Sequence, residues 1–361
     1  MIDTFRIRLS IWVLATSLVG LTAACQPARE PTAAGAGDGG GKTGGSQTVV
    51  VYTSVDQVFS EPVLKAFEAK TGITVKAVYD VEADKTTGLV NRLRAEKSRP
   101  QADVWWNGEF AQTIDLAATG ELAPYKSPMA TDIPAQYVDA GGKWTGFGGR
   151  ARIILVNLNK VKPEDMPKSI YDLVNSKLPG NQIGTARPVF GTGATQAAAL
   201  YKKLGHEAGK AYFQSLKDKG VRIVEGNGLV RDLVVQGELA FGFTDTDDAC
   251  GALAKGAPVQ IVFPDQGKGE MGTLIIPNTV GLVAGGPNPD AGKQLIDYLL
   301  SPQTTSDLIK SEWFQVPLRP VADGTKSCVD TSQVKGMDVG LADISSEIQL
   351  SKTEMADLFV Q

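Results

Sequence analysis

The sequence predicts an α/β protein built from two lobes, and three observations support that fold class. The chain has 361 residues, which suggests two domains at about 100–200 residues per domain. Hydrophobic residues make up 42% of it, enough for ordinary cores. Short apolar segments alternate with amphipathic ones in two blocks, and a stretch rich in Gly and Pro separates the blocks. Such alternation is typical of mainly parallel sheets that helices cover on both faces.

The first block predicts three strands and three helices in alternation. The strands are expected at residues 48–52 (TVVVY), 73–79 (ITVKAVY) and 102–106 (ADVWW). The helices are expected at residues 60–71, 86–97 and 109–119. Gly72 and Gly120 end the first and third helices, because glycine readily adopts the left-handed conformation that closes a helix.

The second block predicts the same alternation with more helices. Its strands are expected at residues 152–158 (RIILVNL), 221–225 and 239–244 (LAFGFT). Its helices are expected at residues 169–174, 194–204, 206–219 and 229–236. In an open α/β sheet, ligands bind beyond the carboxyl ends of the strands, so the loops after these strands are the expected ligand site.

Charge and histidine content argue against several functions. The net charge is −4, with 36 Lys and Arg against 40 Asp and Glu, whereas a nucleic-acid-binding protein normally shows a basic excess. His206 is the single histidine, so a zinc site with two histidines is excluded and a histidine-based triad would need this residue. It lies in the polar sequence KKLGHE at an expected helix start, which predicts a surface residue.

Residues 1–24 are predicted to be an export signal. Arg6 and Arg8 give it a basic start. The apolar run that follows, residues 9–24, is shorter than the roughly 18–20 residues that span a bilayer as a helix. The signal therefore predicts a mature protein in the periplasm or at the cell surface.

The end of this signal, LTAAC, resembles the lipobox of bacterial lipoproteins, with Cys25 as the residue that takes a lipid and becomes the mature N-terminus. The usual box has Leu where this chain has Thr22, and the alternative is a plain signal peptide. Residues 25–46 are rich in Gly and hold no large apolar side chain, which predicts a flexible tether between a membrane and the body.

Cys250 and Cys328 are the other two cysteines of the chain. Three cysteines are too few for a disulfide scaffold, so any disulfide of the mature body would be this one pair. The sequence leaves open whether the two form a disulfide or remain free thiols.

Polar and glycine-containing segments follow the predicted strands in a characteristic order. They occupy residues 53–57, 107–109, 150–152, 190–195, 225–228, 244–248, 263–266 and 274–279. In this order they resemble the solute-binding proteins of bacterial ABC importers, in the branch that contains ferric-iron-binding proteins. The resemblance covers nearly all of residues 48–320.

The resemblance implies a periplasmic-binding-protein fold, whose two lobes close at a hinge on a ligand in the cleft between them. It implies a monomeric receptor that is not an enzyme and that delivers a solute to a membrane permease and its ATPase. The chain is expected to cross between lobes near residues 148–152 and 265–272. Lobe 1 is then residues 47–148 and 269–305, and lobe 2 is residues 149–268 and 306–361.

The residues expected to bind the ligand lie in these loops. They are Ser54, Asp56, Asn107, Glu109, Arg150, Arg152, Thr192, Gly193, Asn227, Asp245, Thr246 and Asp247.

The resemblance implies Fe(III) with a synergistic anion as the transported ligand, and no resident cofactor. In the iron-binding relatives, two adjacent tyrosines, a carboxylate and often a histidine hold the metal. Glu109 matches the carboxylate, but Thr246 and Asp247 stand at the tyrosine positions and the histidine, expected near Asp56 or Gln57, is missing. Glu109 and Asp247 are the remaining candidate metal ligands, and this departure weakens the prediction of iron.

Two further interpretations follow from charge alone. Asp245, Asp247 and Asp248 are hard oxygen donors that suit a cation, although Asp245 could instead cap the following helix. Arg150, Arg152 and the glycine-rich start of a helix at residues 191–193 suit a phosphate, phosphonate or carboxylate, unless the arginines only pair with the same aspartates. A zwitterion with an amine and an anionic group would use both sets.

Four aromatic side chains are candidates for the walls of the cleft: Tyr52, Trp105, Trp106 and Phe190. Neighbouring residues of a strand face opposite sides, so only one tryptophan of the pair is expected there. An exported hydrolase or deaminase is the alternative function, weakened by the single histidine and the absence of a nucleophile-elbow motif. An adhesin or structural lipoprotein is the third.

Overall fold

A computed structural model gives the fold and describes residues 47–80, 87–311, 313, 315–321, 324–331 and 333–359. The predicted export signal, Cys25 and the Gly-rich tether lie outside these residues. The described residues belong to one structural unit, residues 45–361. No helix among them is long and apolar enough to cross a membrane.

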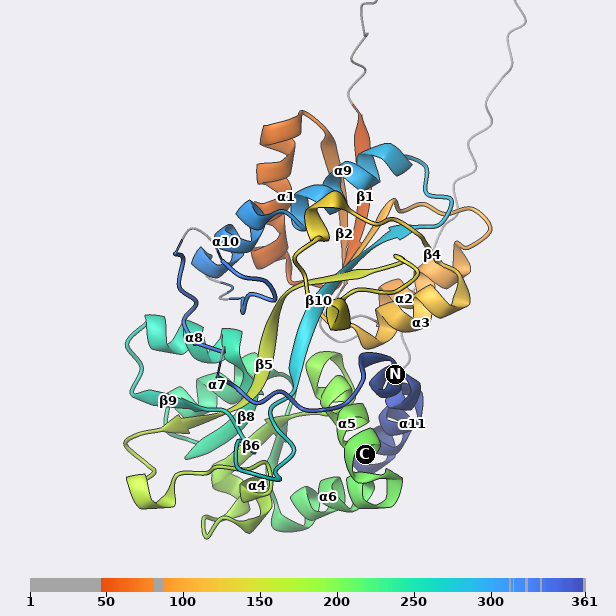
Figure 1. The fold of residues 1–361 in the computed structure, drawn as a ribbon. Helices are drawn as coiled ribbons and strands as arrows, with labels where there is room; N and C mark the ends of the chain where they lie inside the picture. Colours follow the sequence, from red (N-terminus) through yellow and green to blue (C-terminus); the bar gives the residue numbers. More distant parts are fainter. Residues whose placement is uncertain are drawn as a thin grey trace, which may run out of the picture. The chain divides into compact units, whose positions relative to one another are not determined.

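Lobe 1 contains a small parallel sheet with helices on it (Figure 1). Its strands are β1 (Thr48–Thr53), β2 (Thr74–Tyr79), β3 (Val104–Asn107) and the short β4 (Leu122–Ala123). Its helices are α1 (Gln57–Thr71), α2 (Thr87–Ala95), α3 (Ala111–Thr119), α9 (Pro289–Leu299) and α10 (Pro302–Lys310). β1 pairs in parallel with both β2 and β3, as expected for strands joined by helical crossovers.

Lobe 2 repeats this architecture with more helices. Its strands are β6 (Ile183–Ala186), β7 (Arg222–Val224), β8 (Phe241–Asp245) and β9 (Val259–Val262). Its helices are α4 (Asp172–Asn175), α5 (Gly191–Leu204), α6 (His206–Lys219), α7 (Asn227–Val235), α8 (Thr246–Ala254) and α11 (Leu341–Phe359).

Two long antiparallel strands, β5 (Thr145–Asn157) and β10 (Ile275–Val283), run from one lobe into the other. In Figure 1 they lie side by side between the two groups of helices. β10 also pairs with β3, and β5 continues into lobe 2, where it pairs with β8 and β9. The ten strands thus follow the order β2-β1-β3-β10-β5-β8-β6-β7, with β4 on β10 and β9 on β5.

Residues 148–152, where the first lobe crossing was predicted, lie within β5. The return crossing runs through β10, later in the chain than the predicted residues 265–272. A third connection leads from α10 to α11, and on its way Val316 bridges to Gly149 of β5.

Each lobe has its own hydrophobic core. Phe67, Leu299 and Leu308 belong to a core of lobe 1, so the predicted lobe boundary at residues 305 and 306 falls inside α10. Phe213, Phe241 and Met355 of α11 belong to a core of lobe 2. Full burial of one such side chain contributes roughly 1.5–3 kcal/mol to stability. A further cluster containing Phe110, Ala198, Ile276 and Ile344 joins the lobes.

The predicted helix ends agree with the structure at both glycines. Gly72 and Gly120 have φ angles of 75° and 88°, and each donates its backbone N–H to the last turn of its helix. Four of the described strands were not predicted: β4, β6, β9 and β10. The sequence of β6, IGTA, is too short and too rich in small residues to give a strand signal.

Cys250 and Cys328 form a disulfide. It joins α8 of lobe 2 to the connection between α10 and α11. The structure therefore decides the question that the sequence left open.

Candidate functional site

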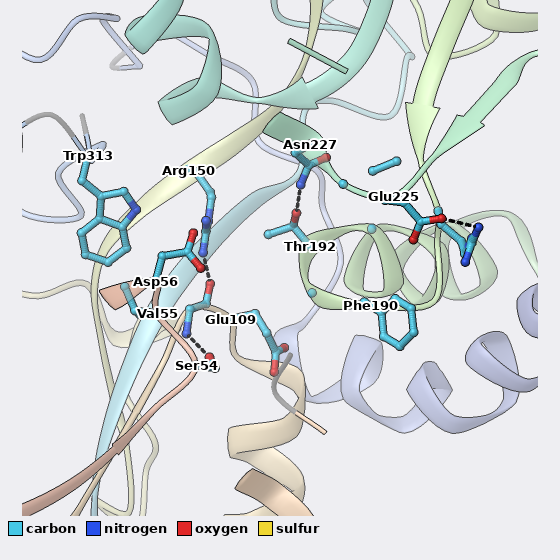
Figure 2. A pocket seen from close by; sticks show the side chains of 16 residues that line it. Ser54, Val55, Asp56, Glu109, Arg150, Phe190, Thr192, Glu225, Asn227 and Trp313 are labelled. Atoms are coloured by element: carbon cyan, nitrogen blue, oxygen red, sulfur yellow. Dashed lines mark hydrogen bonds and ion pairs between the residues drawn. The ribbon is translucent and has the colours of Figure 1, made fainter. Parts of the chain in front are cut away.

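A pocket of about 650 Å³, including its open mouth, lies between the lobes (Figure 2). Lobe 1 contributes the loops after β1 and β3, and lobe 2 contributes the loops after β6 and β7. Both sets of loops follow the carboxyl ends of strands, where the sequence analysis expected the ligand. The lining residues are Ser54, Val55, Asp56, Gly108, Glu109, Arg150, Ala186, Arg187, Phe190, Gly191, Thr192, Gly193, Glu225, Gly226, Asn227 and Trp313.

A chain of hydrogen bonds fixes the wall that lobe 1 provides. The hydroxyl of Ser54 donates to Asn107 Oδ1 at 2.5 Å and accepts from the backbone N–H of Gly108 at 3.0 Å. Asn107 Nδ2 in turn donates to Glu109 Oε1 at 2.7 Å. Asn107 is fully buried, so it orients Ser54 and Glu109 and does not line the pocket itself.

The carboxylate of Glu109 is held at the start of α3. It accepts from the backbone N–H groups of Ala111 at 2.5 Å and Gln112 at 3.1 Å, and thus caps the helix. The hydroxyl of Thr195, on α5 of lobe 2, donates to it at 3.4 Å. Burial raises the pKa of Glu109, while its hydrogen bonds and the charge of Lys352 oppose that rise. Glu109 is therefore a contact between the lobes as well as a wall of the pocket.

The N-terminus of α5 faces the pocket from lobe 2. Gly191, Thr192 and Gly193 form its first turn and all three line the pocket. Phe190, at the N-cap, makes no side-chain capping bond, and the first turn holds no acidic residue. Gly191 has φ 47°, a left-handed conformation that glycine adopts without strain. The free backbone N–H groups at the start of this 14-residue helix thus lie beside the pocket, an arrangement that suits an anion.

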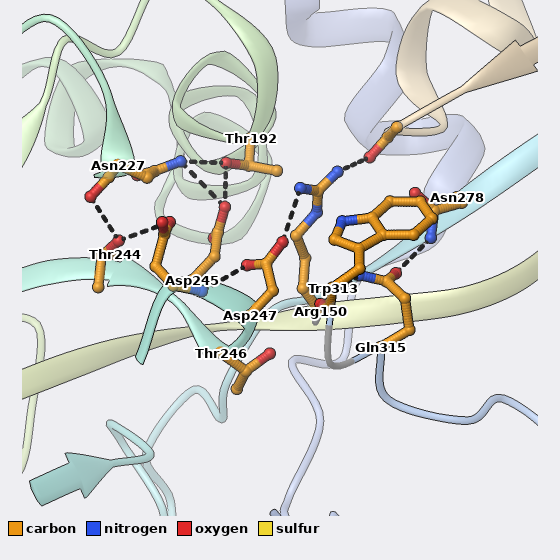
Figure 3. Close-up of polar contacts among 12 residues, drawn as sticks. Arg150, Thr192, Asn227, Thr244, Asp245, Thr246, Asp247, Asn278, Trp313 and Gln315 are labelled. Carbon is orange, nitrogen blue, oxygen red and sulfur yellow. Dashed lines mark hydrogen bonds and ion pairs between the residues drawn. The ribbon is translucent and has the colours of Figure 1, made fainter. Parts of the chain in front are cut away.

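A buried polar network lies under the start of α5 (Figure 3). Arg152 Nη1 donates to Asp245 Oδ1 at 2.6 Å and to Asn227 Oδ1 at 2.9 Å. The other oxygen of Asp245 accepts from the Thr192 hydroxyl at 2.7 Å and from Asn227 Nδ2 at 2.9 Å. Asp245 stands at the N-cap of α8 but makes no capping bond with its side chain, because its carboxylate serves this network.

Arg150 connects the lobes at the floor of the pocket. Its Nη2 donates to the backbone oxygen of Gly108 in lobe 1 at 2.5 Å, and its Nη1 donates to Asp247 Oδ2 in lobe 2 at 3.2 Å. Burial by itself lowers the pKa of Arg150, but the surrounding carboxylates, Asp247 above all, raise the pKa beyond its ordinary value. Arg150 is therefore a charged guanidinium with acidic neighbours on one side and the pocket on the other.

The acidic residues gather in a second cavity, which shares Asp56, Arg150 and Asn227 with the pocket. Oxygens of Asp245, Asp247 and Asp248 all lie within 4.8 Å of one another.

The carboxylates of this acidic cluster already have cationic partners. Asp245 pairs with Arg152, Asp247 with Arg150, and Asp248 with Arg231 at 3.2 Å. Burial and the neighbouring aspartates raise the pKa of Asp248 to about 8, and burial also raises the pKa of Asp247. Glu109, the other candidate metal ligand, is not a member of this cluster. Thr246 is fully buried, and its hydroxyl accepts from the backbone N–H of Ala151.

The predicted ligand residues thus fall into three groups. Seven line the pocket: Ser54, Asp56, Glu109, Arg150, Thr192, Gly193 and Asn227. Two border the second cavity and not the pocket: Asp245 and Asp247. Three are buried behind these surfaces: Asn107, Arg152 and Thr246.

Three lining residues lie outside the predicted loops: Ala186, Arg187 and Trp313. Ala186 ends β6, a strand that gave no signal, and Arg187 follows it and pairs with Glu225 at 2.8 Å. Trp313 comes from the connection after α10, and nothing in its local sequence indicates that it reaches the pocket.

Of the expected aromatic walls, only Phe190 lines the pocket. Trp105 and Trp106 are both fully buried, so the expectation that one of them faces the cleft was wrong. Trp106 packs instead against Trp313, with 6.2 Å between ring centroids. Tyr52 is also buried, and its hydroxyl donates to Glu96 at 3.0 Å.

The family of the chain follows from comparison with known proteins. A family model described as bacterial extracellular solute-binding protein matches residues 63–335. The chain belongs to this family. As a bacterial extracellular solute-binding protein, it is the binding component of an ABC importer, in agreement with the resemblance seen in its loops.

The relatives of this solute-binding protein in sequence are named for different ligands. It is 30% identical over 251 residues to a protein of Salmonella typhimurium named "Putative 2-aminoethylphosphonate-binding periplasmic protein", covering 69% of this chain and 71% of the relative. It is 24% identical over 306 residues to the "Major ferric iron-binding protein" of Neisseria meningitidis serogroup A, covering 83% of this chain and 89% of that one. These relatives support a periplasmic location.

Solved structures confirm the predicted periplasmic-binding-protein fold. The ferric binding protein from Campylobacter jejuni superposes with a TM-score of 0.76 at 22% identity, over 86% of this chain and 99% of that one. The periplasmic binding protein AfuA from Actinobacillus pleuropneumoniae, with exogenous fructose-6-phosphate bound, gives a TM-score of 0.74 at 22% identity, over 87% and 98%.

Proposed function

We propose that this solute-binding protein captures a small solute that carries a phosphonate, phosphate ester or carboxylate group. The observation that carries the proposal is the first turn of α5, residues 191–193, which lines the pocket together with Arg150 and Arg187. A helix N-terminus stabilises an anion by roughly 0.3–2 kcal/mol, depending on burial. Guanidinium groups add charge and can bind two anionic oxygens at once.

The same pocket also suits an amine. Asp56, Glu109 and Glu225 are carboxylates among the lining residues. A zwitterion would place its anionic group at α5 and the arginines, and its ammonium group near these carboxylates. The relative named for 2-aminoethylphosphonate supports this ligand class, and the AfuA structure with fructose-6-phosphate supports a phosphate ester.

Fe(III) with an anion is the second candidate, favoured by the gathering of Asp245, Asp247 and Asp248 and by the iron-binding relatives. Two observations oppose it. Among the lining residues that the structure describes there is no tyrosine and no histidine. Arg150 and Arg152 already neutralise two of the three aspartates, and a cation would have to approach these guanidinium groups.

A ligand panel tests the proposal. The mature protein is freed of metal with a chelator and then mixed with 2-aminoethylphosphonate, inorganic phosphate, small carboxylic acids, or Fe(III) with citrate. A ligand present at a hundred times its Kd stabilises the fold by about 2.7 kcal/mol, so thermal unfolding and calorimetry detect it. Binding of a metal-free anion or zwitterion is the expected result. Binding of Fe(III) alone would contradict the proposal and favour the aspartates as metal ligands.

We further propose that the protein is a monomer anchored by a lipid on Cys25, that it meets a permease and its ATPase at the membrane, and that it catalyses no reaction. The LTAAC sequence and the Gly-rich residues 25–46 support the anchor. Cys25→Ser should release the protein from membranes and leave the body folded, because the tether adds nothing to the core. Membrane fractionation after a high-salt wash measures this, and a variant that stays with the membrane would contradict the anchor.

A further inference from the structure

We propose that the carboxylate of Asp247 competes with the ligand's anionic group for Arg150, and so sets the affinity and selectivity of the pocket. The inference rests on the proposed function, since it takes an anionic ligand as given. It assigns Asp247 a role opposite to that of a ligand residue: the side chain weakens binding instead of providing it.

The first step is the placement of Arg150. Its side chain lines both the pocket and the second cavity, whereas Asp247 lines only the second cavity. One terminal nitrogen of the guanidinium is held by Gly108 and the other by Asp247, while the buried Nε has no partner among the described residues. Each terminal nitrogen keeps a second N–H group, so an anion can bind the guanidinium, but it then shares the single positive charge with the carboxylate of Asp247.

The second step is the nature of the contact with Gly108. A Cβ atom at this position would lie 2.9 Å from Arg150 Nη2, so a larger residue would displace the end of the arginine side chain. The backbone oxygen of Gly108 carries no net charge and does not compete electrostatically with an anion. Asp247 is also hydrogen-bonded to Arg150, and its carboxylate does compete electrostatically with an anion.

The third step is the charge around Asp247. Its oxygens lie within 4.8 Å of those of Asp245 and Asp248, so three carboxylates share a small volume. Arg152 pairs with Asp245 and Arg231 pairs with Asp248. Arg150 is the ion-pair partner of Asp247. Burial, and to a lesser extent the charge of Asp245, raise the pKa of Asp247, so this carboxylate gives up its charge more readily than an exposed one.

Asp248 provides a matched control. It is the next residue in the chain and also a buried carboxyl group, but this group is bonded to Arg231 at 3.2 Å and to the Thr244 hydroxyl at 3.2 Å. Asp248→Asn leaves the hydrogen bond between Arg150 and Asp247 intact. The difference between Asp247→Asn and Asp248→Asn therefore isolates direct competition.

The experiment is calorimetric titration of the mature protein with 2-aminoethylphosphonate and, separately, with inorganic phosphate. We expect Asp247→Asn to bind these probes about tenfold more tightly than the wild type, the size of one charge-assisted hydrogen bond. Asp248→Asn should change affinity by no more than about twofold, as expected for a screened charge. In an Arg150→Gln background, Asp247→Asn should have no effect, because the contested cation is gone.

Equal effects of the two asparagine variants, or weaker binding in Asp247→Asn, would overturn the inference. Weaker binding would make Asp247 a partner of the ligand's amine or of a metal. Melting curves confirm that each variant is folded, and Asp247→Ser replaces Asp247→Asn if that variant is not. Failure of the proposed function can be told apart from failure of this inference. In the first case the wild type binds neither probe, and in the second the wild type still binds them.

Discussion

Arg152 Nη1 and Asp245 Oδ1 are 2.6 Å apart, and both side chains are 2% exposed. The guanidinium also lies over the ring of Phe243, 4.5 Å from its centroid. This ion pair joins β5 to β8, whose residues Arg152 and Asp245 are direct partners in the strand register. Through Thr192 and Asn227 it fixes the first turns of α5 and α7, so it shapes the pocket without lining it.

Arg152→Ala should therefore act mainly on stability. Removal of one partner leaves Asp245 as a buried charge without its cation, which costs roughly 3–5 kcal/mol. Arg222→Ala is the control, because its pair with Glu238 is exposed at 38% and 52% and contributes at most about 1 kcal/mol. Urea unfolding measures both. Similar losses in the two variants would contradict the buried-pair interpretation.

Arg187→Gln should act on ligand affinity. The side chain lines the pocket, and its partner Glu225 is 74% exposed, so the ion pair adds little stability. We expect about a tenfold loss of affinity for 2-aminoethylphosphonate and a change in stability below about 0.5 kcal/mol. Calorimetry and melting curves give the two values, with Arg222→Gln as a control away from the pocket. Unchanged affinity would remove Arg187 from the anion site.

Asp248→Asn should stabilise the protein at alkaline pH. The pKa of Asp248 is about 8 in the folded state, against about 3.9 in an unfolded chain. The folded state thus binds the proton more tightly, and this stabilisation is complete below pH ~3.9 and is lost as pH rises to about 8. The Tm of the variant relative to that of the wild type should therefore rise steadily between pH 5 and pH 8.5.

Asp232→Asn is the matched control for this titration. Asp232 also pairs with Arg231, at 2.8 Å, but is 48% exposed. It should show no such gap in Tm between pH 5 and pH 8.5. A constant difference between Asp248→Asn and wild type across the pH range would show that Asp248 does not titrate there.

His206→Gln should change the pH dependence of the protein's stability. His206 is the first residue of α6 in lobe 2. The hydrogen bond from His206 to Glu354 on α11, 2.9 Å long, raises the pKa of the histidine above 6.5. Its stabilisation is complete below the unfolded pKa of ~6.5 and is lost as pH rises through the higher folded value. The wild type should exceed the variant in Tm at pH 5.5, and the difference should shrink by pH 8.5.

Lys210→Gln controls for the loss of a cation beside Glu354. Lys210 lies 3.5 Å from the same carboxylate, and histidine, unlike lysine, is the residue type that changes charge between pH 5 and 8. Its effect on Tm should be the same at pH 5.5 and pH 8.5. A pH-independent effect of His206→Gln would contradict the titration of His206.

The sequence by itself predicted the alternation of strands and helices up to residue 244 and most of the loops that carry the pocket, but not β4, β6, β9 or β10 and not helices α9, α10 and α11. Helix α6 was predicted with the bounds that the structure shows, because its amphipathic pattern is long and Gly220 ends it. The strand-end rule placed Ser54, Glu109 and Asn227 at one site although they are far apart in the chain. Local signals suffice for such features, since periodicity and helix caps are properties of short segments.

The tertiary structure alone decided which charges reach the pocket. Arg150 and Arg152 are two residues apart on one strand and look equivalent in the sequence. β5 passes from one lobe into the other at this point, so Arg150 lies at the junction and faces the pocket, while Arg152 lies beneath α5 and is buried. Trp313 and Arg187 reach the pocket from a connection and an unpredicted strand. Burial depends on which distant segments pack on a residue, and no pattern within the segment itself records that.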